Sequence, residues 1–293
     1  MLSHSKLPLD TRALDELTTL VSKAAAVVKR FQGGTVDSRL KSDHSPVTAA
    51  DEASQAVILD GLGKIFPGIP VISEEADKPD RTSALPSLFL LVDPLDGTRE
   101  FIAGRNAFTV NLAIVADRVP AWGCIAAPLL DRVWRGGTGL GAERLDLEAG
   151  ADVTASQPTP IRTRRMPECD MVITVSRSHL DAQTQLFIRR FPAAKSVALG
   201  SSLKFCYIAE GNADLYPRLA PTCEWDIAAG HAIVSGAGGM VVEPAGDALI
   251  YGQSARDFRV PAFVALGDPA AIERICEAAA GHEGSTADVS ASD

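Results

Sequence analysis

The chain has 293 residues, 46% of them hydrophobic, and a formal net charge of −9 at pH 7. This length suits one large domain or two closely packed ones, and the hydrophobic fraction can supply a sizeable core. The negative charge argues against a protein that coats a nucleic-acid polymer, which needs clustered lysine and arginine, but it is compatible with a small phosphorylated ligand bound through a metal ion.

The cysteines and the hydrophobic segments favour a cytoplasmic protein. The cysteine count of five is odd and the sequence has no CxxC pair, so neither a disulfide framework nor a zinc ribbon is indicated. The N-terminal segment lacks the apolar core of a signal peptide, and no window approaches the ~20 apolar residues of a membrane span. We therefore expect no transmembrane segment, and leave a peripheral association with the inner membrane and the oligomeric state open.

In the first part of the chain, the hydrophobic pattern predicts helices followed by strands. Amphipathic helices are predicted at residues 10–31 and 48–66, and buried strands at residues 69–73 and 88–92. Antiparallel strands joined by turns are predicted at residues 108–137. Thr48 precedes the second helix as its expected N-cap.

In the second part of the chain, apolar runs alternate with helical patterns. Strands are predicted near residues 171–175, 196–199, 213–216, 239–243 and 262–266. Helices are predicted at about residues 179–191, 201–211, 225–236 and 268–280. This alternation predicts a layered α/β architecture.

The composition also predicts where the chain divides. Residues 149–168 mix proline, serine, threonine and charge, which is typical of a connection. We expect an N-terminal α+β half at residues 1–150 and a C-terminal α/β half at residues 165–280. Residues 281–293 are small, polar and acidic, and we expect them to form a disordered tail.

The segment VDPLDGT follows a predicted buried strand with two aspartates, Asp93 and Asp96. Pro94 fixes one φ angle and Gly97 permits an unusual one, so we expect a rigid turn that brings the two carboxylates together. A divalent cation would relieve their repulsion, and oxygen ligands favour Mg²⁺, Mn²⁺ or Ca²⁺ over zinc. The carbonyl of Leu95 is a further candidate ligand. The alternative is an ordinary turn rich in aspartate.

Three further acidic residues lie beside predicted elements. Glu74 follows a predicted strand in VISEEA, Asp226 begins a predicted helix beside Trp225, and Asp51 lies in the first turn of another. Each has a structural alternative: a solvated loop acid, a favourable charge at a helix start, and a capping box with Thr48. The combination with VDPLDGT would require four coincidences, which favours a metal site.

The motifs SPVTAAD, ISEE, DPLDGT and WDIAAGHAI…GAGG resemble, in this order, those of the inositol monophosphatase superfamily of Mg²⁺-dependent, lithium-sensitive phosphatases. The segments TVSRSHLD, GSSLKFCYIAEGNADLYPRLAPT and GTREFIAGRNAFTVNLAIV are similar to those of its bacterial 3'(2'),5'-bisphosphate nucleotidases. The resemblance covers about residues 40–245. It implies an αβαβα sandwich and a cytoplasmic enzyme of sulfate assimilation and nucleotide recycling, which hydrolyses the 3'-phosphate of adenosine 3',5'-bisphosphate to leave AMP.

The resemblance also implies a metal site with two or three Mg²⁺ ions. Glu74, Asp93 and the Leu95 carbonyl would bind the first ion. Asp93 would bridge to the second, which Asp96 and Asp226 would also bind. Phosphoryl transfer depends mainly on positioning and charge neutralisation, which such ions supply.

Catalytic roles follow from the same resemblance. Thr98 and Glu74 would position and activate the attacking water, and Asp51 would accept a hydrogen bond from the Thr98 hydroxyl. The backbone N–H groups of Gly97 and Thr98, at a helix N-terminus, would hold the scissile phosphate.

Candidates for substrate binding come mostly from the second half of the chain. The SRSH segment lies where a strand meets a helix, which suits anion binding. Lys204 lies in the first turn of a predicted helix, where the helix dipole disfavours a cation unless an anionic ligand is present. Surface polar residues and helix caps are the alternative. The candidates are Gly97, Thr98, Ser176, Arg177, Ser178, His179, Ser202, Lys204, Tyr216, Arg218 and Asp226.

Three positions depart from the family pattern. Ala107 stands before Phe108 where an acidic residue is expected, and Arg99 stands where lysine is often found. Glu224 adds negative charge near Asp226, which would strengthen metal binding or discourage an anionic substrate.

Two other functions stay open. The first is inositol monophosphatase or fructose-1,6-bisphosphatase activity. The second is a non-enzymatic nucleotide or Mg²⁺ sensor on the same scaffold. Thr98 argues against the sensor, because a sensor needs ligands but no hydroxyl that activates water.

Overall fold

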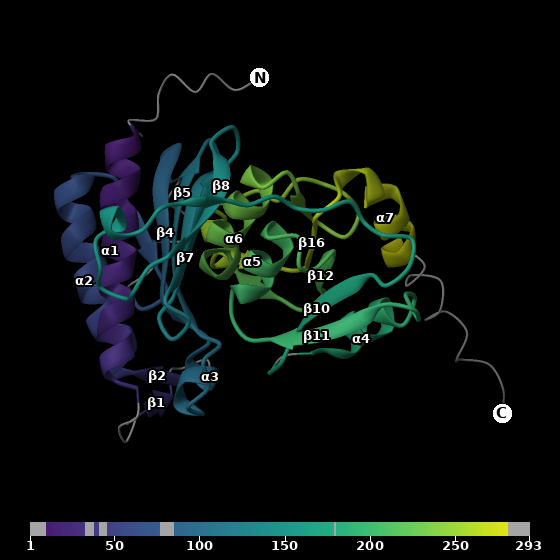
Figure 1. Ribbon diagram of the computed structural model, residues 1–293, viewed down its shortest axis with the longest axis horizontal. Coiled ribbons are helices and arrows are strands. Elements are labelled where there is room, and N and C mark those ends of the chain that lie inside the picture. Colours follow the sequence, from purple (N-terminus) through teal and green to yellow (C-terminus); the bar gives the residue numbers. More distant parts are fainter. Residues whose placement is uncertain (1–9, 33–37, 41–45, 77–84, 179, 281–293) are drawn as a thin grey trace.

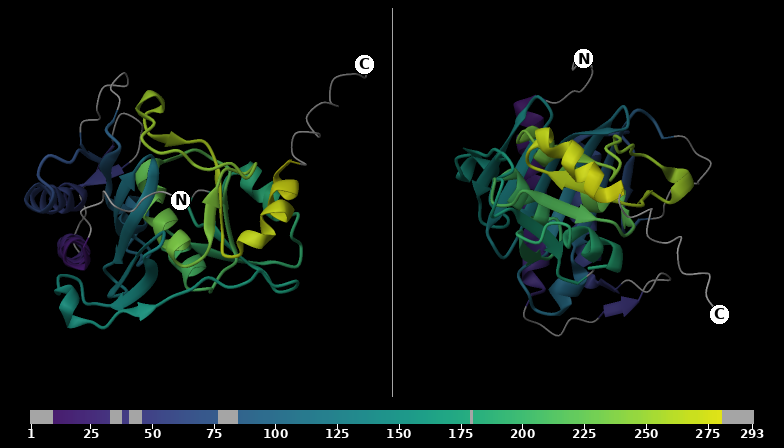
Figure 2. Two further views of the ribbon diagram at one scale, coloured as in Figure 1. Left: turned by 90° about the horizontal axis from the view of Figure 1, so that it is seen from above. Right: turned by 90° about the vertical axis from the view of Figure 1, so that its right-hand side faces the viewer.

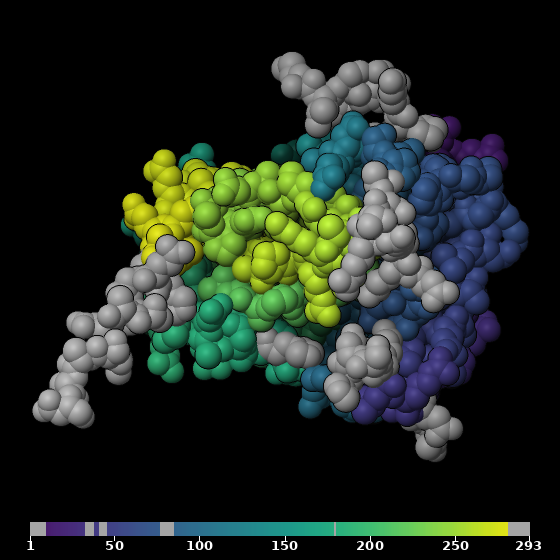
Figure 3. Space-filling model, turned by 180° about the vertical axis from the view of Figure 1, so that it is seen from behind, coloured from purple at the N-terminus to yellow at the C-terminus, as the bar shows by residue number. Residues whose placement is uncertain are grey.

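The computed structural model describes residues 10–32, 38–40, 46–76, 85–178 and 180–280. Within them, helices and sheets alternate in five layers: outer helices, a seven-stranded sheet, central helices, a five-stranded sheet and further helices (Figure 1). This is the αβαβα sandwich that the family resemblance implies, and it agrees with the layered α/β architecture predicted from the alternating pattern. The purple-to-blue and green-to-yellow parts of the chain occupy opposite ends of the molecule (Figure 3).

The helices cover three surfaces of the two sheets. α1 and α2 lie on the outer face of the first sheet, α5 and α6 lie between the sheets, and α4 and α7 pack on the second sheet (Figures 1 and 2). The short helix α3 follows the fourth strand. The bounds are α1 Thr11–Arg30, α2 Ala49–Ile65, α3 Thr98–Ile102, α4 Ala182–Ile188, α5 Leu203–Ala209, α6 Glu224–Gly236 and α7 Ile272–Ala280.

The first sheet has the strand order β3-β4-β5-β6-β7-β8-β9. β3 and β4 run parallel, and the later neighbours run antiparallel. Its bounds are β3 Val71–Ser73, β4 Leu88–Asp96, β5 Thr109–Ala116, β6 Val119–Ala127, β7 Arg132–Gly137, β8 Gly141–Asp146 and β9 Thr159–Pro160. One face is covered by α1 and α2 through buried residues such as Leu17, Ile58 and Leu112. The other face packs against α6.

The second sheet has the order β11-β10-β12-β16-β14, with β10 parallel to both of its neighbours. Its bounds are β10 Val172–Ser176, β11 Lys195–Leu199, β12 Leu215–Arg218, β14 Met240–Val242 and β16 Phe263–Leu266. Two small antiparallel pairs complete the strands: β1 Ser38–Leu40 with β2 Pro46–Thr48, and β13 Thr222–Cys223 with β15 Arg259–Val260. No helix in the described ranges is both long enough and apolar enough to cross a bilayer.

The predicted elements are present, with differences at their ends. Thr48 is the N-cap of α2, as predicted. The strand predicted at 88–92 continues to Asp96, and the helix predicted at 179–191 is shorter, at Ala182–Ile188. The helix predicted at 268–280 begins as a 3₁₀ turn at Pro269–Ala271 before α7. The predicted disordered tail at 281–293 lies outside the described residues.

Candidate active site

The two aspartates of VDPLDGT lie on β4 around a β-bulge. Asp93 pairs with Asn111 of β5 and Asp96 pairs with Thr109, so two residues of β4 face one residue of β5 between these pairs. In a regular strand, residues three apart point to opposite faces; the extra residue of the bulge turns Asp96 toward the side of Asp93. The rigid turn expected here is therefore wrong, because the strand continues through both aspartates. Both of them nevertheless line one cleft.

Thr98 is held at the start of α3 by contacts to two segments. Gly97, the N-cap, has a φ of 90°, a left-handed conformation that favours glycine. The Thr98 hydroxyl lies 3.3 Å from Oδ1 of Asp51 and 3.2 Å from the carbonyl oxygen of Leu95. The other oxygen of Asp51 accepts hydrogen bonds from the N–H and hydroxyl of Thr48, at 2.8 and 2.6 Å. Asp51 thus completes the capping box and also reaches the cleft.

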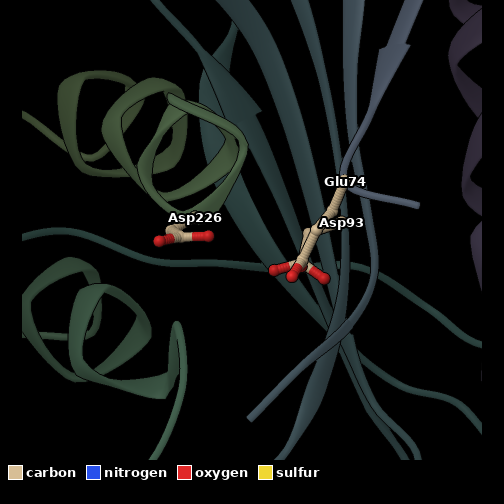
Figure 4. Close-up of side chains that lie close together, drawn as sticks. All are labelled: Glu74, Asp93 and Asp226. Carbon is tan, nitrogen blue, oxygen red and sulfur yellow. The ribbon is translucent and has the colours of Figure 1, made fainter. Parts of the chain in front are cut away.

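Three carboxylates from different elements converge in the cleft (Figure 4). Glu74 follows β3, Asp93 lies on β4 and Asp226 lies in the first turn of α6, and one ligand atom of each lies within 4.8 Å of the others. Burial, followed by the negative charges of Glu74, Asp96 and Asp226, raises the pKa of Asp93 well above its ordinary value. Oxygen ligands that repel one another at this spacing fit a hard divalent cation.

Asp96 lies next to this group but outside the set of three. Its Oδ2 accepts a hydrogen bond from the Ser202 hydroxyl at 2.6 Å and lies 3.4 Å from Nδ2 of Asn111. Nδ2 of Asn111 also donates to Ser202 Oγ at 2.9 Å. Asn111 is not among the residues predicted from the sequence, although an asparagine inside the apolar run FTVNLAIV is a usable signal. These bonds fix the orientation of Asp96 toward the cleft.

Asp226 is also a helix-capping residue. Its Oδ2 accepts hydrogen bonds from the Thr222 hydroxyl and, at 3.1 Å, from the N–H of Cys223, which precedes α6. Asp226 therefore caps α6 and also belongs to the group of three carboxylates.

The carboxylate of Glu224 contacts a neighbouring loop and does not line the cleft. Its carboxylate is fully buried and accepts the N–H groups of Gly252 and Gln253, at 2.6 and 2.8 Å. Those amides draw the side chain to the loop that follows β14, so Glu224 does not line the cleft. The effect of its charge on metal binding or on an anionic substrate stays a prediction.

Lys204 places a buried cation at the first turn of α5, and its Nζ lies 5.0 Å from the centre of the Tyr216 ring. Burial lowers the pKa of Lys204 to about 8, although Asp96 and Asp226 act to raise it. Arg218 lies beside Tyr216 on β12, and within the described residues its Nε is buried with no hydrogen-bond partner. Burial also raises the pKa of Tyr216 to about 12.

The SRSH segment is only partly at the cleft. Ser176 and Ser178 line it, whereas Arg177 does not: its Nη2 donates to the carbonyl of Ala198 on β11 at 3.1 Å. His179 lies outside the described residues. Glu100, a buried residue of α3 that lines the cleft, is also absent from the predicted site residues.

The cleft has a volume of about 230 Å³. Of the predicted site residues, it is lined by Glu74, Asp93, Leu95, Asp96, Gly97, Thr98, Ser176, Ser178, Ser202, Lys204, Tyr216, Arg218 and Asp226. Asp51 reaches it through Thr98.

Comparisons with known proteins show the family of the chain. The sequence model of the inositol monophosphatase family matches residues 10–283. The 3'(2'),5'-bisphosphate nucleotidase CysQ of Escherichia coli (strain K12) is 38% identical over 240 residues, which are 81% of this chain and 93% of that protein. CysQ of Buchnera aphidicola is 33% identical over 249 residues, 84% of this chain and 89% of that protein.

Solved structures show the same fold. CysQ from Bacteroides thetaiotaomicron has a TM-score of 0.74 and 32% identity, covering 89% of this chain and 99% of its own. An inositol monophosphatase from Thermotoga maritima has a TM-score of 0.76 over 92% of this chain and 98% of its own. At 23% identity, the second likeness shows the fold alone.

Proposed function

The chain belongs to the inositol monophosphatase family, and we propose that it is a Mg²⁺-dependent phosphatase that converts adenosine 3',5'-bisphosphate to AMP and phosphate. The observation that carries this proposal is one cleft that contains both a carboxylate group and two cationic side chains, the buried Lys204 and the half-buried Arg218. A substrate with two phosphates can use both features at once. The names of the relatives at 38% and 32% identity support the nucleotide as substrate.

The carboxylates would hold the metal ions. Glu74, Asp93 and the Leu95 carbonyl would bind one Mg²⁺, and Asp93, Asp96 and Asp226 another, with two or three ions per site. When bound, the ions supply positive charge that lowers the pKa of an attacking water and stabilises the leaving oxygen. The hydrogen bonds from Ser202 and Asn111 to Asp96 keep that carboxylate oriented before any ion arrives.

Residues around α3 would direct the hydrolysis. Thr98 and Glu74 orient the water, and Asp51 holds the Thr98 hydroxyl in place. The water gives up a proton as its oxygen forms a bond to phosphorus, the bond from phosphorus to the 3' oxygen breaks, and that oxygen takes up a proton from solvent to leave as the 3'-hydroxyl. The N–H groups of Gly97 and Thr98 hold the phosphoryl oxygens.

The nucleotide side of the cleft would bind the second phosphate. Lys204 and Arg218 supply positive charge, and the Nε of Arg218, which has no hydrogen-bond partner among the described residues, offers a donor that an anion would satisfy. Ser176 and Ser178 add hydroxyl groups to the cleft lining, and Tyr216 supplies an aromatic ring beneath the Lys204 ammonium.

The first experiment measures phosphate release from adenosine 3',5'-bisphosphate, inositol 1-phosphate and fructose 1,6-bisphosphate, with and without Mg²⁺. We expect Mg²⁺-dependent release with a strong preference for the nucleotide. A preference for a sugar phosphate would keep the metal site but remove the roles of Lys204 and Arg218.

Thr98→Ala separates an enzyme from a sensor. We expect turnover of the nucleotide to fall about 10²- to 10⁴-fold, because a group that positions the water is lost, while calorimetry shows unchanged nucleotide binding. The control is Thr154→Ala, which makes the same change at an exposed position. No release from any substrate by the unmodified protein, together with nucleotide binding, would favour the sensor.

A further inference from the structure

Glu100 of α3 places a buried carboxylate between segments that are far apart in the sequence. Its side chain is 3% exposed, and one oxygen accepts a hydrogen bond from the Ser178 hydroxyl, 78 residues away. The other oxygen lies 3.1 Å from Nη1 of Arg105. The guanidinium of Arg177 lies 3.8 Å away. Glu100 therefore joins α3 to the segment that follows β10.

The surrounding backbone leaves room for this side chain. Gly200 precedes α5, and a Cβ atom at that position would lie 3.0 Å from Cγ of Glu100 and 2.5 Å from the carbonyl oxygen of Ala107. A larger residue at Gly200 would therefore collide with the backbone at Ala107. Three cleft segments meet at Glu100 as a result: the start of α3, the end of β10 and the turn before α5.

The charges around Glu100 keep it ionised. Burial acts to raise the pKa of Glu100, but the hydrogen bonds from Ser178 and Arg105 outweigh this effect and hold the pKa below its ordinary value. The carboxylate is thus an acceptor at neutral pH, with the guanidinium groups of Arg105 and Arg177 within 4 Å of it.

We propose that Glu100 is a positioning residue that fixes the nucleotide side of the cleft relative to the hydrolytic side. It lies two residues after Thr98, and it holds Ser178 and, through the backbone, Ser176 at the end of β10. A bisphosphate must contact both sides together, whereas a 3'-monophosphate needs only the hydrolytic side. This inference rests on the proposed function and assigns Glu100 a role in recognising the second phosphate.

The kinetic test compares adenosine 3',5'-bisphosphate with adenosine 3'-phosphate in Glu100→Ala, Ser178→Ala and the double variant. For Glu100→Ala we expect KM for the bisphosphate to rise about tenfold, while kcat and the KM for the monophosphate change less than about threefold. The double variant should be no worse than the more affected single variant, because both changes break one contact. Glu100→Gln keeps an acceptor for Ser178 and should recover part of the KM. Glu273→Ala, at an exposed position of α7, is the matched control.

A second readout does not depend on turnover. Hydrogen–deuterium exchange of residues 172–178 in the metal-free protein should be faster in Glu100→Ala than in the unmodified chain, and unchanged in Glu273→Ala. Ser178→Ala lies on an exposed residue and keeps the test available if Glu100→Ala does not fold.

Three outcomes would overturn the proposal: an equal KM rise for both substrates, additive effects in the double variant, or unchanged exchange of residues 172–178. Failure of the unmodified protein to hydrolyse the bisphosphate would instead reject the proposed function, and the exchange measurement would still report whether Glu100 holds the end of β10.

Discussion

Single side chains at the cleft have structural and chemical roles at once. Asp51 caps α2 and contacts Thr98, and Asp226 caps α6 and faces Glu74 and Asp93. A carboxylate at the third position of a helix can reach the N-cap amide and still direct an oxygen outward. The sequence left open whether Asp51 and Asp226 are helix caps or site residues, and in the structure each is placed to be both.

Asp93 carries the most unfavourable charge of the site when no metal is bound. We expect Asp93→Asn to reduce turnover about 10²- to 10⁴-fold and to weaken Mg²⁺ binding, since it removes the negative charge shared between the ions. The same change should raise the Tm of the metal-free protein by about 2–4 °C, because it removes a buried charge that three carboxylates repel.

Scanning calorimetry in EDTA and in Mg²⁺ measures both effects on stability, and phosphate release measures turnover. Asp152→Asn, at an exposed position, is the control. Near-normal turnover of Asp93→Asn at millimolar Mg²⁺ would contradict the metal assignment, and a lower Tm in EDTA would contradict the charge argument.

At the scale of elements, the bulge in β4 decides which carboxylates meet. The sequence places Asp93 and Asp96 three positions apart, a spacing that separates side chains in a regular strand. In the pairing with β5, β4 has one extra residue between the two aspartates, and this bulge turns the Asp96 side chain toward the side of Asp93. The residues of β5 opposite the bulge are remote in sequence, so the pattern around VDPLDGT alone could predict the convergence but not the geometry that produces it.

α6 also contains a titratable group that links it to the loop after β14. Burial lowers the pKa of His231 to about 4, and its Nδ1 lies 2.9 Å from the Tyr251 hydroxyl. Below the ordinary pKa of about 6.5, the unfolded chain binds a proton that the folded chain does not. We expect neutral His231 to contribute up to about 3 kcal/mol to the free energy of unfolding. This contribution is fully present above pH 6.5 and is lost as the pH falls toward 4.

Urea unfolding between pH 4 and 7.5 gives the free energy of unfolding of the unmodified chain and of His231→Gln. Subtracting one from the other removes the effect of the carboxylates, which both proteins share. The difference in unfolding free energy should shrink as the pH falls. A difference that is constant across this range would mean that His231 does not titrate on unfolding.

At the scale of the whole molecule, α6 connects the two sheets. It follows β13 in the chain but packs on the first sheet, and it supplies Asp226 to the carboxylates on β4 and after β3. The close packing of α6 on β6 depends on small residues. A Cβ at Gly123 of β6 would lie 2.4 Å from the carbonyl oxygen of Ala229 in α6. The site therefore exists only when α6 is seated on the first sheet.

Gly123→Ala tests this seating. We expect it to lower the free energy of unfolding by about 1–3 kcal/mol and to weaken Mg²⁺ binding, because Asp226 would move with α6. Calorimetry and Mg²⁺ titration measure the two effects. Gly63→Ala in α2, where a Cβ meets no atom within 4 Å, is the control and should stabilise the chain by up to about 1 kcal/mol. Equal behaviour of the two variants would reject the argument.

The sequence by itself determined the layered α/β class, most helices and strands, and the residues of the carboxylate group. Hydrophobic periodicity and capping residues act over a few positions, so they can be read locally. Only the tertiary structure decided the bulge, the orientation of Glu224 toward Gly252 and Gln253, and the contact of Glu100 with Ser178. Those features depend on pairing between segments distant in the chain, because a buried polar group takes whichever partner the fold brings within hydrogen-bond distance.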